Sequence, residues 1–434
     1  MKRFVNFNIQ DPWNTGQSVW NNELVVDQDG IILPPGAETG QEPIETIDGN
    51  GRWLVPGFCD TYCFFGEPGL EYRETIRTGS EAALAGGFTS VCIYPNTRPP
   101  VDNLQTYEYL QSKIGGAPID IHIVASLTKG CEGQFIAPVM SFTSVGVHLF
   151  SDGLQPVQSS LQMKRTCEYV SMYDGLVIQS PEDRTLAGQG VLNEGVQSAR
   201  LGLPGVPAIT ESLMVHRDGE IARETGVRLH FSNLTTRAGI EAFSYQKARG
   251  ANLSCGVSPF YFLLSDDHLD WYNTNFKLWP PLRSESDRLA VIEAIRSGVI
   301  DMIPSSHMPQ SEIEKTTDFI SAPIGAIGLE TTFAASYTGL VKQGILSIGS
   351  LLERLIVNPR KRFGLKPNPL RPGEPADFVI IDPFETVTVL KDSLRSKSRN
   401  TPFLNQRFIG SVDAVFTRNR YHTFQEPAGN EYAG

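Results

Sequence analysis

The sequence predicts a TIM-type (β/α)₈ barrel joined to a small β-sandwich that is built from both ends of the chain. From Val55 to about residue 365, short apolar runs alternate with stretches of helical spacing, and eight such units are typical of this barrel. Before and after this region, short β-like pieces are separated by Gly, Asn, Asp and Pro turns. A chain of 434 residues has room for a barrel of roughly 250 residues or more and a smaller unit. We therefore assign residues 55–365 to the barrel, and residues 1–54 and 366–434 to the composite sandwich.

The barrel strands are expected where apolar runs end in turn residues. In chain order these are Phe58–Phe65, Thr89–Tyr94, Ile119–Ser126, Gly146–Ser151, Leu176–Gln179, Arg228–Asn233, Ala251–Val257 and Val299–Pro304. Helical spacing lies between most of them, for example at Glu74–Ala85 and Glu285–Ser297. The sandwich strands are expected at Arg3–Ile9, Val19–Val26, Gly30–Leu33, Ile44–Ile47, Phe378–Asp382 and Ser411–Thr417. In a barrel of this kind, a functional site lies at the carboxyl ends of the strands.

Composition excludes several classes of function. The chain has 37 basic and 48 acidic residues, and its net charge of −11 argues against nucleic acid or an anionic membrane as a partner. No apolar run is long enough to span a bilayer, and the first residues do not have the pattern of a signal peptide. The six cysteines are scattered without a CxxC pair, which is typical of reduced core residues. We therefore expect a cytoplasmic protein.

The first predicted barrel strand places its side chains on two faces. Because successive side chains of a strand alternate, Asp60, Tyr62 and Phe64 share one face, whereas Cys59 and Cys63 share the other. The two cysteines are expected to face the helices and to pack there, rather than to bind a metal.

Several motifs at the strand ends form one consistent set. Pro56-Gly57-x-x-Asp60 and Glu67-Pro68-Gly69 frame the first strand, and the second is followed by Pro95-Asn96-Thr97-Arg98-Pro99-Pro100. With these motifs, the chain resembles the dihydroorotases of the long type, which are cyclic amidohydrolases of pyrimidine biosynthesis. The resemblance covers nearly the whole chain. It implies a barrel that holds one or two zinc ions, which activate water and polarise a cyclic amide, while a carboxylate from the last strand shuttles the proton.

The resemblance also locates the family's functional positions in this sequence. Three are retained: Asn96 at a substrate-contacting position, Asp152 at the position of the metal-bridging carboxylate, and His307 after the last strand. The others are replaced. Four histidine ligands correspond to Tyr62, Phe64, Ser180 and Asn233, the arginine that grips the substrate carboxylate to Gly66, a substrate-contacting asparagine to Trp279, and the proton-shuttling aspartate to Ser306.

These replacements predict a protein without a metal and without the family's hydrolytic activity. Asp152 alone cannot hold zinc, because such sites take at least three protein ligands. The bulky side chains of Tyr62, Phe64 and Trp279 are expected to fill the space that a metal and its water need. By analogy with the non-catalytic dihydroorotase homologues of some bacteria, we expect an oligomer, either of this chain alone or with aspartate transcarbamoylase.

Two alternatives remain open. The chain is an active hydrolase of a cyclic amide that uses Asp152 and His307, either without a metal or with one held by an unforeseen set of ligands. Alternatively, it is a binding module that keeps the pocket for a pyrimidine precursor. Against both, Asn96 and His307 are read more simply as hydrogen-bonded residues of the interior.

Overall fold

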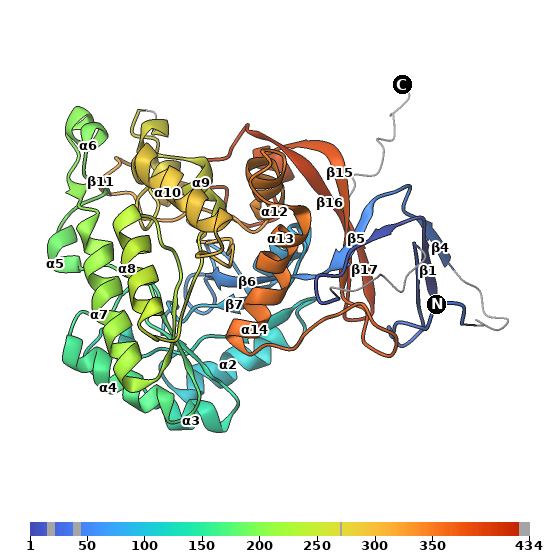
Figure 1. Cartoon of the computed structure of the whole chain (residues 1–434), viewed down its shortest axis with the longest axis horizontal. Helices are drawn as coiled ribbons and strands as arrows, with labels where there is room; N and C mark the ends of the chain where they lie inside the picture. The colour runs from blue at the N-terminus through green and yellow to red at the C-terminus, as the bar shows by residue number, and fades with distance from the viewer. Residues whose placement is uncertain (15–21, 38–44, 270, 425–434) are drawn as a thin grey trace.

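The barrel forms the larger part of the molecule. The structure is a computed structural model and describes residues 1–14, 22–37, 45–269 and 271–424. Residues 19–21 and Ile44, which belong to predicted strands, lie outside the described residues. Figure 1 shows β6 and β7 surrounded by helices, with a β-rich part beside them that contains the first and last segments of the chain.

Seven strands form most of the barrel wall. They are β6 (Phe58–Cys63), β7 (Phe88–Ile93), β8 (Asp120–Ile123), β9 (Leu149–Ser151), β10 (Leu176–Gln179), β13 (Arg228–Phe231) and β14 (Leu253–Cys255). All pair in parallel, in the orders β6-β7-β8 and β9-β10-β13-β14.

Single β-bridges close the ring. One bridge joins Ala125 to Phe150, a second joins Gly256 to Met302, and a third joins Cys63 to His307. The eighth predicted strand, Val299–Pro304, is therefore reduced to the bridge at Met302. The predicted barrel is confirmed, although most of its strands are shorter than the sequence pattern suggested.

Helices cover the outside of the barrel. Their bounds are α1 (Ile76–Ala85), α2 (Leu104–Ile114), α3 (Val139–Ser144), α4 (Ser160–Ser171), α5 (Arg184–Ala187), α6 (Val196–Leu201), α7 (Ile209–Thr225), α8 (Arg237–Ala248), α9 (Pro259–Leu263), α10 (Glu285–Arg296), α11 (Glu312–Lys315), α12 (Thr332–Ser336), α13 (Ile348–Leu352) and α14 (Asn358–Phe363). Short 3₁₀ or π turns lie at Lys129–Cys131, Asp266–His268, Thr274–Phe276, Tyr337–Val341, Glu353–Val357 and Lys391–Ser393. Side-chain caps begin the main helices: Thr75 caps α1, Asn103 caps α2, and Ser284 caps α10. None of the helices in the described parts of the chain is long and apolar enough to cross a membrane.

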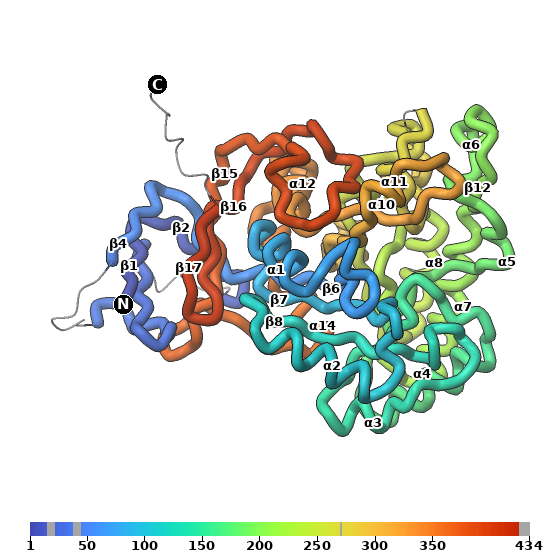
Figure 2. The backbone as a smooth tube through the Cα atoms, turned by 180° about the vertical axis from the view of Figure 1, so that it is seen from behind, coloured from blue at the N-terminus to red at the C-terminus, as the bar shows by residue number. Residues whose placement is uncertain are grey.

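The two ends of the chain meet in one β-rich part. Its strands are β1 (Lys2–Val5), β2 (Asn8–Ile9), β3 (Glu23–Val26), β4 (Glu45–Asp48), β5 (Trp53–Pro56), β15 (Phe378–Thr388), β16 (Arg407–Thr417) and β17 (Arg420–Thr423). They form a three-stranded sheet, β3-β1-β4, and a five-stranded sheet, β17-β16-β15-β5-β2. Phe4 of the first sheet packs edge-on against Phe378 of the second, with ring centroids 4.9 Å apart. Figure 2 shows the last strands, in red, beside the first strands, in blue.

A short parallel pair, β11 (Leu192–Asn193) and β12 (Gly205–Val206), lies outside these sheets. The chain passes from the β-rich part to the barrel at Gly57, between β5 and β6. No side chain larger than hydrogen fits there, because a Cβ at Gly57 would lie 2.1 Å from Thr89 Oγ1 and 2.5 Å from Asp377 Oδ1. The crossing therefore brings the wall of the barrel against the start of β15.

Candidate functional site

Three aromatic rings occupy the interior of the barrel near the carboxyl ends of β6 and β7. Tyr62 and Phe64 follow the strand alternation inward, whereas Cys63 belongs to the core between the barrel wall and the helices. The Tyr62 ring lies 5.3 Å from that of Phe64 and 4.7 Å from that of Tyr94, and Phe64 and Tyr94 are 5.2 Å apart, all measured between centroids. Their exposed fractions are 1%, 8% and 2%. We call Tyr62, Phe64 and Tyr94 the aromatic cluster.

The hydroxyl groups of this cluster are held by serines. Tyr62 Oη lies 3.2 Å from Ser180 Oγ, and Tyr94 Oη lies 3.3 Å from Ser232 Oγ. Burial raises the pKa of Tyr62 to about 12, so its hydroxyl is neutral at physiological pH. The cluster thus offers neutral hydroxyls rather than a charged acid or base.

A hydrogen bond joins Asn233 and Ser306, two of the replaced positions at the strand ends. Asn233 Nδ2 donates to Ser306 Oγ over 3.0 Å, and Asn233 Oδ1 accepts a hydrogen bond of 3.0 Å from the amide of Ser258. Ser306 has a φ of 51°, the left-handed region that few residues other than glycine adopt. This pair holds the loop after the last strand, but neither side chain can serve as a general base at neutral pH.

Asp152 is buried and engaged within the protein. Its Oδ1 accepts from the amide of Thr128 over 2.8 Å, and its Oδ2 accepts from the Thr128 hydroxyl. Burial raises the pKa of Asp152 to about 7, although these hydrogen bonds oppose the shift. Asn96 Nδ2 donates to the main-chain oxygen of Asp152 over 3.0 Å, so the structure brings these two retained residues together.

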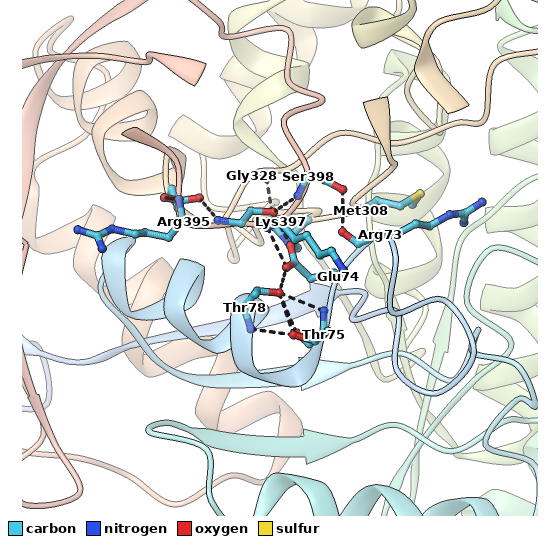
Figure 3. Close-up of polar contacts among 12 residues, drawn as sticks. Arg73, Glu74, Thr75, Thr78, Met308, Gly328, Arg395, Lys397 and Ser398 are labelled. Atoms are coloured by element: carbon cyan, nitrogen blue, oxygen red, sulfur yellow. Dashed lines mark hydrogen bonds and ion pairs between the residues drawn. The ribbon is translucent and has the colours of Figure 1, made fainter. Parts of the chain in front are cut away.

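His307, the third retained residue, belongs to a different network. Its Nε2 lies 3.4 Å from Glu74 Oε2, and its Nδ1 accepts from the amide of Gly328 over 3.3 Å. Glu74 also accepts hydrogen bonds from the Ser396 hydroxyl, the Thr78 hydroxyl and, over 3.0 Å, the amide of Lys397. Figure 3 shows the segment that contains Lys397 and Ser398 lying across Glu74.

The charge of Glu74 is stabilised by these partners. Burial raises its pKa, but the nearby imidazole of His307, together with the hydroxyls of Ser396 and Thr78, outweighs burial and holds the pKa below its ordinary value. His307 therefore faces the carboxylate of Glu74, just before α1. Among the described residues, no hydrogen bond or ion pair joins His307 to Asp152.

A small cavity remains at the mouth of the barrel. It has a volume of about 50 Å³ and lies among residues that include Phe64, Gly66, Arg73 and Asn96. A water molecule needs roughly 10–15 Å³ on this measure, so the cavity has room for a few waters. A Cβ at Gly66 would lie 2.2 Å from the main-chain oxygen of Leu70, so this turn requires glycine. Trp279 is only partly buried, and among the described residues no ring contact joins it to the aromatic cluster.

Two residues of this region were missed by the sequence reasoning. Tyr94 completes the aromatic cluster, and its inward position could have been read from the alternation of the predicted strand Thr89–Tyr94. Glu74 had no such signal, because its partners Ser396 and Lys397 are more than 300 residues away in the sequence.

Known proteins with the same fold include hydantoinases. The structure of L-hydantoinase from Arthrobacter aurescens superimposes with a TM-score of 0.85 over 98% of this chain and 96% of that one, at 22% identity. D-hydantoinase from Thermus sp. gives a TM-score of 0.82 over 100% of this chain, at 20% identity. These likenesses define the fold class: a TIM-type barrel with a separate β-rich part.

Sequence comparisons give the family. The family described as Dihydro-orotase-like matches residues 51–239. A protein of Desulforapulum autotrophicum named Dihydroorotase is 38% identical over 422 residues, which cover 96% of this chain and 98% of that protein. A protein of the same name from Thermoanaerobacter sp. is 38% identical over 370 residues, covering 85% and 86%. This chain belongs to the dihydroorotase-like family.

The donor set at the family's ligand positions does not match a zinc site. Zinc is bound by thiolate, imidazole or carboxylate. Here Tyr62 and Phe64 present rings, Ser180 and Asn233 present neutral oxygen and nitrogen atoms, and the carboxylate of Asp152 is bonded to Thr128. These side chains therefore do not fit a zinc ion.

The prediction that the chain takes no cofactor is nevertheless wrong. The family resemblance implies a metal-dependent hydrolase, and one group of carboxylates in the described residues could hold a cation. Asp382, Glu385 and Asp413 place one oxygen atom each within 4.8 Å of one another. They lie on β15 and β16, where β15 shifts its register between Asp382 and Thr386. Sequence reasoning considered only the barrel mouth and therefore missed this group.

Proposed function

We propose that this chain is a dihydroorotase homologue of pyrimidine biosynthesis whose barrel mouth does not hydrolyse the cyclic amide, and which serves as a structural or regulatory subunit. The aromatic cluster is the main support, because its three buried rings lie at the strand ends where the resemblance places the family's metal and substrate. Two further observations agree with it. Ser306 has no titratable group to shuttle a proton, and the turn at Gly66 has no room for the arginine that would grip the substrate carboxylate.

An activity assay tests the first half of this proposal. The purified chain is supplied with zinc and dihydroorotate, and the relative from Desulforapulum autotrophicum is assayed in parallel. We expect kcat/KM to be at least about 10⁴-fold lower for this chain, since general acid–base catalysis alone contributes roughly 10²–10⁴-fold. A value within 100-fold of the relative would overturn the proposal.

The proposed partner is aspartate transcarbamoylase, in a cytoplasmic mixed oligomer. The support is the resemblance to non-catalytic dihydroorotase homologues, since a rigid barrel can keep its outer faces as an assembly surface after hydrolysis is lost. Sedimentation of this chain with the transcarbamoylase of the same organism tests it. One species heavier than either protein alone is expected, whereas two independently sedimenting species would contradict the assembly.

An active cyclic-amide hydrolase is the second candidate. Its support is the identity of 37–38% to several proteins named Dihydroorotase over most of their length. In that reading, Asp152, with its pKa near 7, would act as the acid or base. The same assay separates the candidates, and loss of measurable turnover in Asp152→Asn would favour the second.

A further inference from the structure

A polar cavity lies beside α11, separate from the cavity at the barrel mouth. It has a volume of about 300 Å³, and its walls include Thr274, Glu312, Lys315, Lys391, Arg399 and Asn400. None of the residues that line the mouth cavity lines this one. Figure 2 shows α11 close to α10, on the side of the barrel away from α2 and α3.

Lys315 is a buried lysine that forms no ion pair within the described part of the chain. Its exposed fraction is 7%, and its Nζ donates to the main-chain oxygens of Thr274 and Pro323, both over 2.9 Å. Among the described residues, no carboxylate lies within ion-pair distance of this ammonium. A lysine ammonium has three hydrogens to donate, so one remains for another acceptor. Burial, with the charge of Lys277, lowers the pKa of Lys315 to about 7.

Further positive charge reaches the same cavity from a different part of the chain. Arg399 is half-buried, and its Nη1 donates a hydrogen bond of 3.1 Å to the main-chain oxygen of Ser398. No carboxylate of the described residues pairs with it. Lys391 forms an ion pair with Glu312. The cavity thus gathers three basic side chains and one carboxylate, in a chain whose net charge is −11.

The walls of this cavity are held in place by hydrogen bonds. Asn400 Nδ2 donates to the main-chain oxygens of Met308 and Gly325 over 3.2 and 2.9 Å, and its Oδ1 accepts from the amide of Gln310 over 3.0 Å. Thr274 Oγ1 donates to the main-chain oxygen of Lys315 over 2.6 Å. The cations therefore sit on fixed backbone, which lowers the entropy lost when a ligand binds.

We propose that this cavity binds the phosphate group of a small phosphorylated molecule, with Lys315 and Arg399 as its charge partners. An arginine side chain is always charged, and because the pKa of Lys315 is about 7, an anion bound beside Lys315 would favour its charged form. The two side chains would then match the roughly two negative charges of a phosphate monoester. Arginine and lysine are the side chains that proteins use most for this group, the first through its planar fork and the second as a point charge. The proposal does not depend on activity at the barrel mouth.

Calorimetric titration with inorganic phosphate tests this site in the full chain. We expect saturable binding with one site, weakened tenfold or more by Arg399→Gln, which corresponds to about 1.4 kcal/mol. Arg395→Gln is the matched control, because Arg395 is on the same segment but lines a different cavity, and its binding should equal that of the unchanged protein. Absence of saturable binding, or equal binding by Arg399→Gln, would overturn the proposal.

Two more measurements complete the test. Lys315→Met should abolish binding while its circular dichroism spectrum stays unchanged; if this variant does not fold, Arg399→Gln decides alone. Succinate is titrated as a dicarboxylate of similar charge. Tighter binding of succinate than of phosphate would refute the assignment to phosphate, whereas weaker binding supports it.

Discussion

Asp152 is a residue whose ionisation opposes folding. Its pKa is about 7 in the folded chain and near 3.8 when unfolded, so the native state holds a proton that the unfolded chain releases between these values. Stability therefore falls as the pH rises through this window. From pH 5 to pH 8, we expect the free energy of unfolding of the unchanged chain to fall by about 2 to 3 kcal/mol. In Asp152→Asn, this fall should be absent.

Urea unfolding of both proteins at pH 5 and pH 8 measures this difference. The asparagine keeps an oxygen to accept the amide of Thr128, so the fold is expected to survive. Asp174→Asn is the control, because the side chain of Asp174 is 92% exposed. If Asp152→Asn loses as much stability with pH as the unchanged chain, the raised pKa is refuted.

Gly66 is a residue that the local backbone demands. A Cβ at this position would lie 2.2 Å from the oxygen of Leu70 and 2.8 Å from that of Glu74, and both contacts are with main chain. We expect Gly66→Ala to lower the free energy of unfolding by about 2 kcal/mol or more. Gly66→Arg should lower the free energy of unfolding by a similar amount, without creating a site for a carboxylate.

Gly116→Ala is the control, because a Cβ at Gly116 meets nothing within 4 Å. It should change the free energy of unfolding by less than about 0.5 kcal/mol. Equal melting temperatures for all variants would contradict this account.

At the scale of the element, the segment Arg395–Ser398 depends on Glu74. The carboxylate accepts from Ser396, Lys397 and Thr78 and faces His307, so its removal leaves several buried groups without their partner. We expect Glu74→Gln to lower the free energy of unfolding by about 3 kcal/mol. Because the pKa of Glu74 is lowered by folding, its contribution is present above the unfolded value near 4.5 and is lost as the pH falls below it.

Chemical unfolding at pH 7 and pH 3 checks both statements. The gap between Glu74→Gln and the unchanged chain should be large at pH 7 and should narrow at pH 3. Glu81→Gln, which removes an exposed carboxylate paired with Arg77, should stay within about 0.5 kcal/mol of the unchanged chain. A gap that is the same at both pH values would argue against a charged Glu74 in the fold.

The elements also show what the sequence can and cannot predict. The alternation along β6 predicted that Tyr62 and Phe64 point inward, because a period of two residues is a local property. The eighth predicted strand does not form, since the segment around Met302 makes only a single β-bridge, to Gly256. The group of Asp382, Glu385 and Asp413 arises from the pairing of β15 with β16 across a register shift, which no local pattern specifies.

At the scale of the whole molecule, the β-rich part and the barrel are joined by an ion pair between a buried arginine and a partly buried aspartate. Arg360 on α14 has an exposed fraction of 3%, and its Nη2 donates to the main-chain oxygen of Gly57 over 3.2 Å. The same atom lies 3.6 Å from Asp377 Oδ2, just before β15. Asp377 also accepts from Thr89 over 3.0 Å. One arginine thus connects a barrel helix, the crossing at Gly57 and the start of β15.

We predict that this pair couples the two parts energetically. Arg360→Met leaves the carboxylate of Asp377 without its cation and should cost about 3 kcal/mol or more. Asp377→Asn in the same chain removes the unpaired charge, so the double variant should be more stable than the sum of the two single losses predicts. Denaturant unfolding of all four proteins gives the coupling energy, which we expect to be at least about 1 kcal/mol.

Arg371→Met serves as the control, because Arg371 is an exposed cation six residues before Asp377. This variant should show no coupling with Asp377→Asn. Strictly additive losses for Arg360 and Asp377 would mean that the crossing is held by packing around Gly57 rather than by charge.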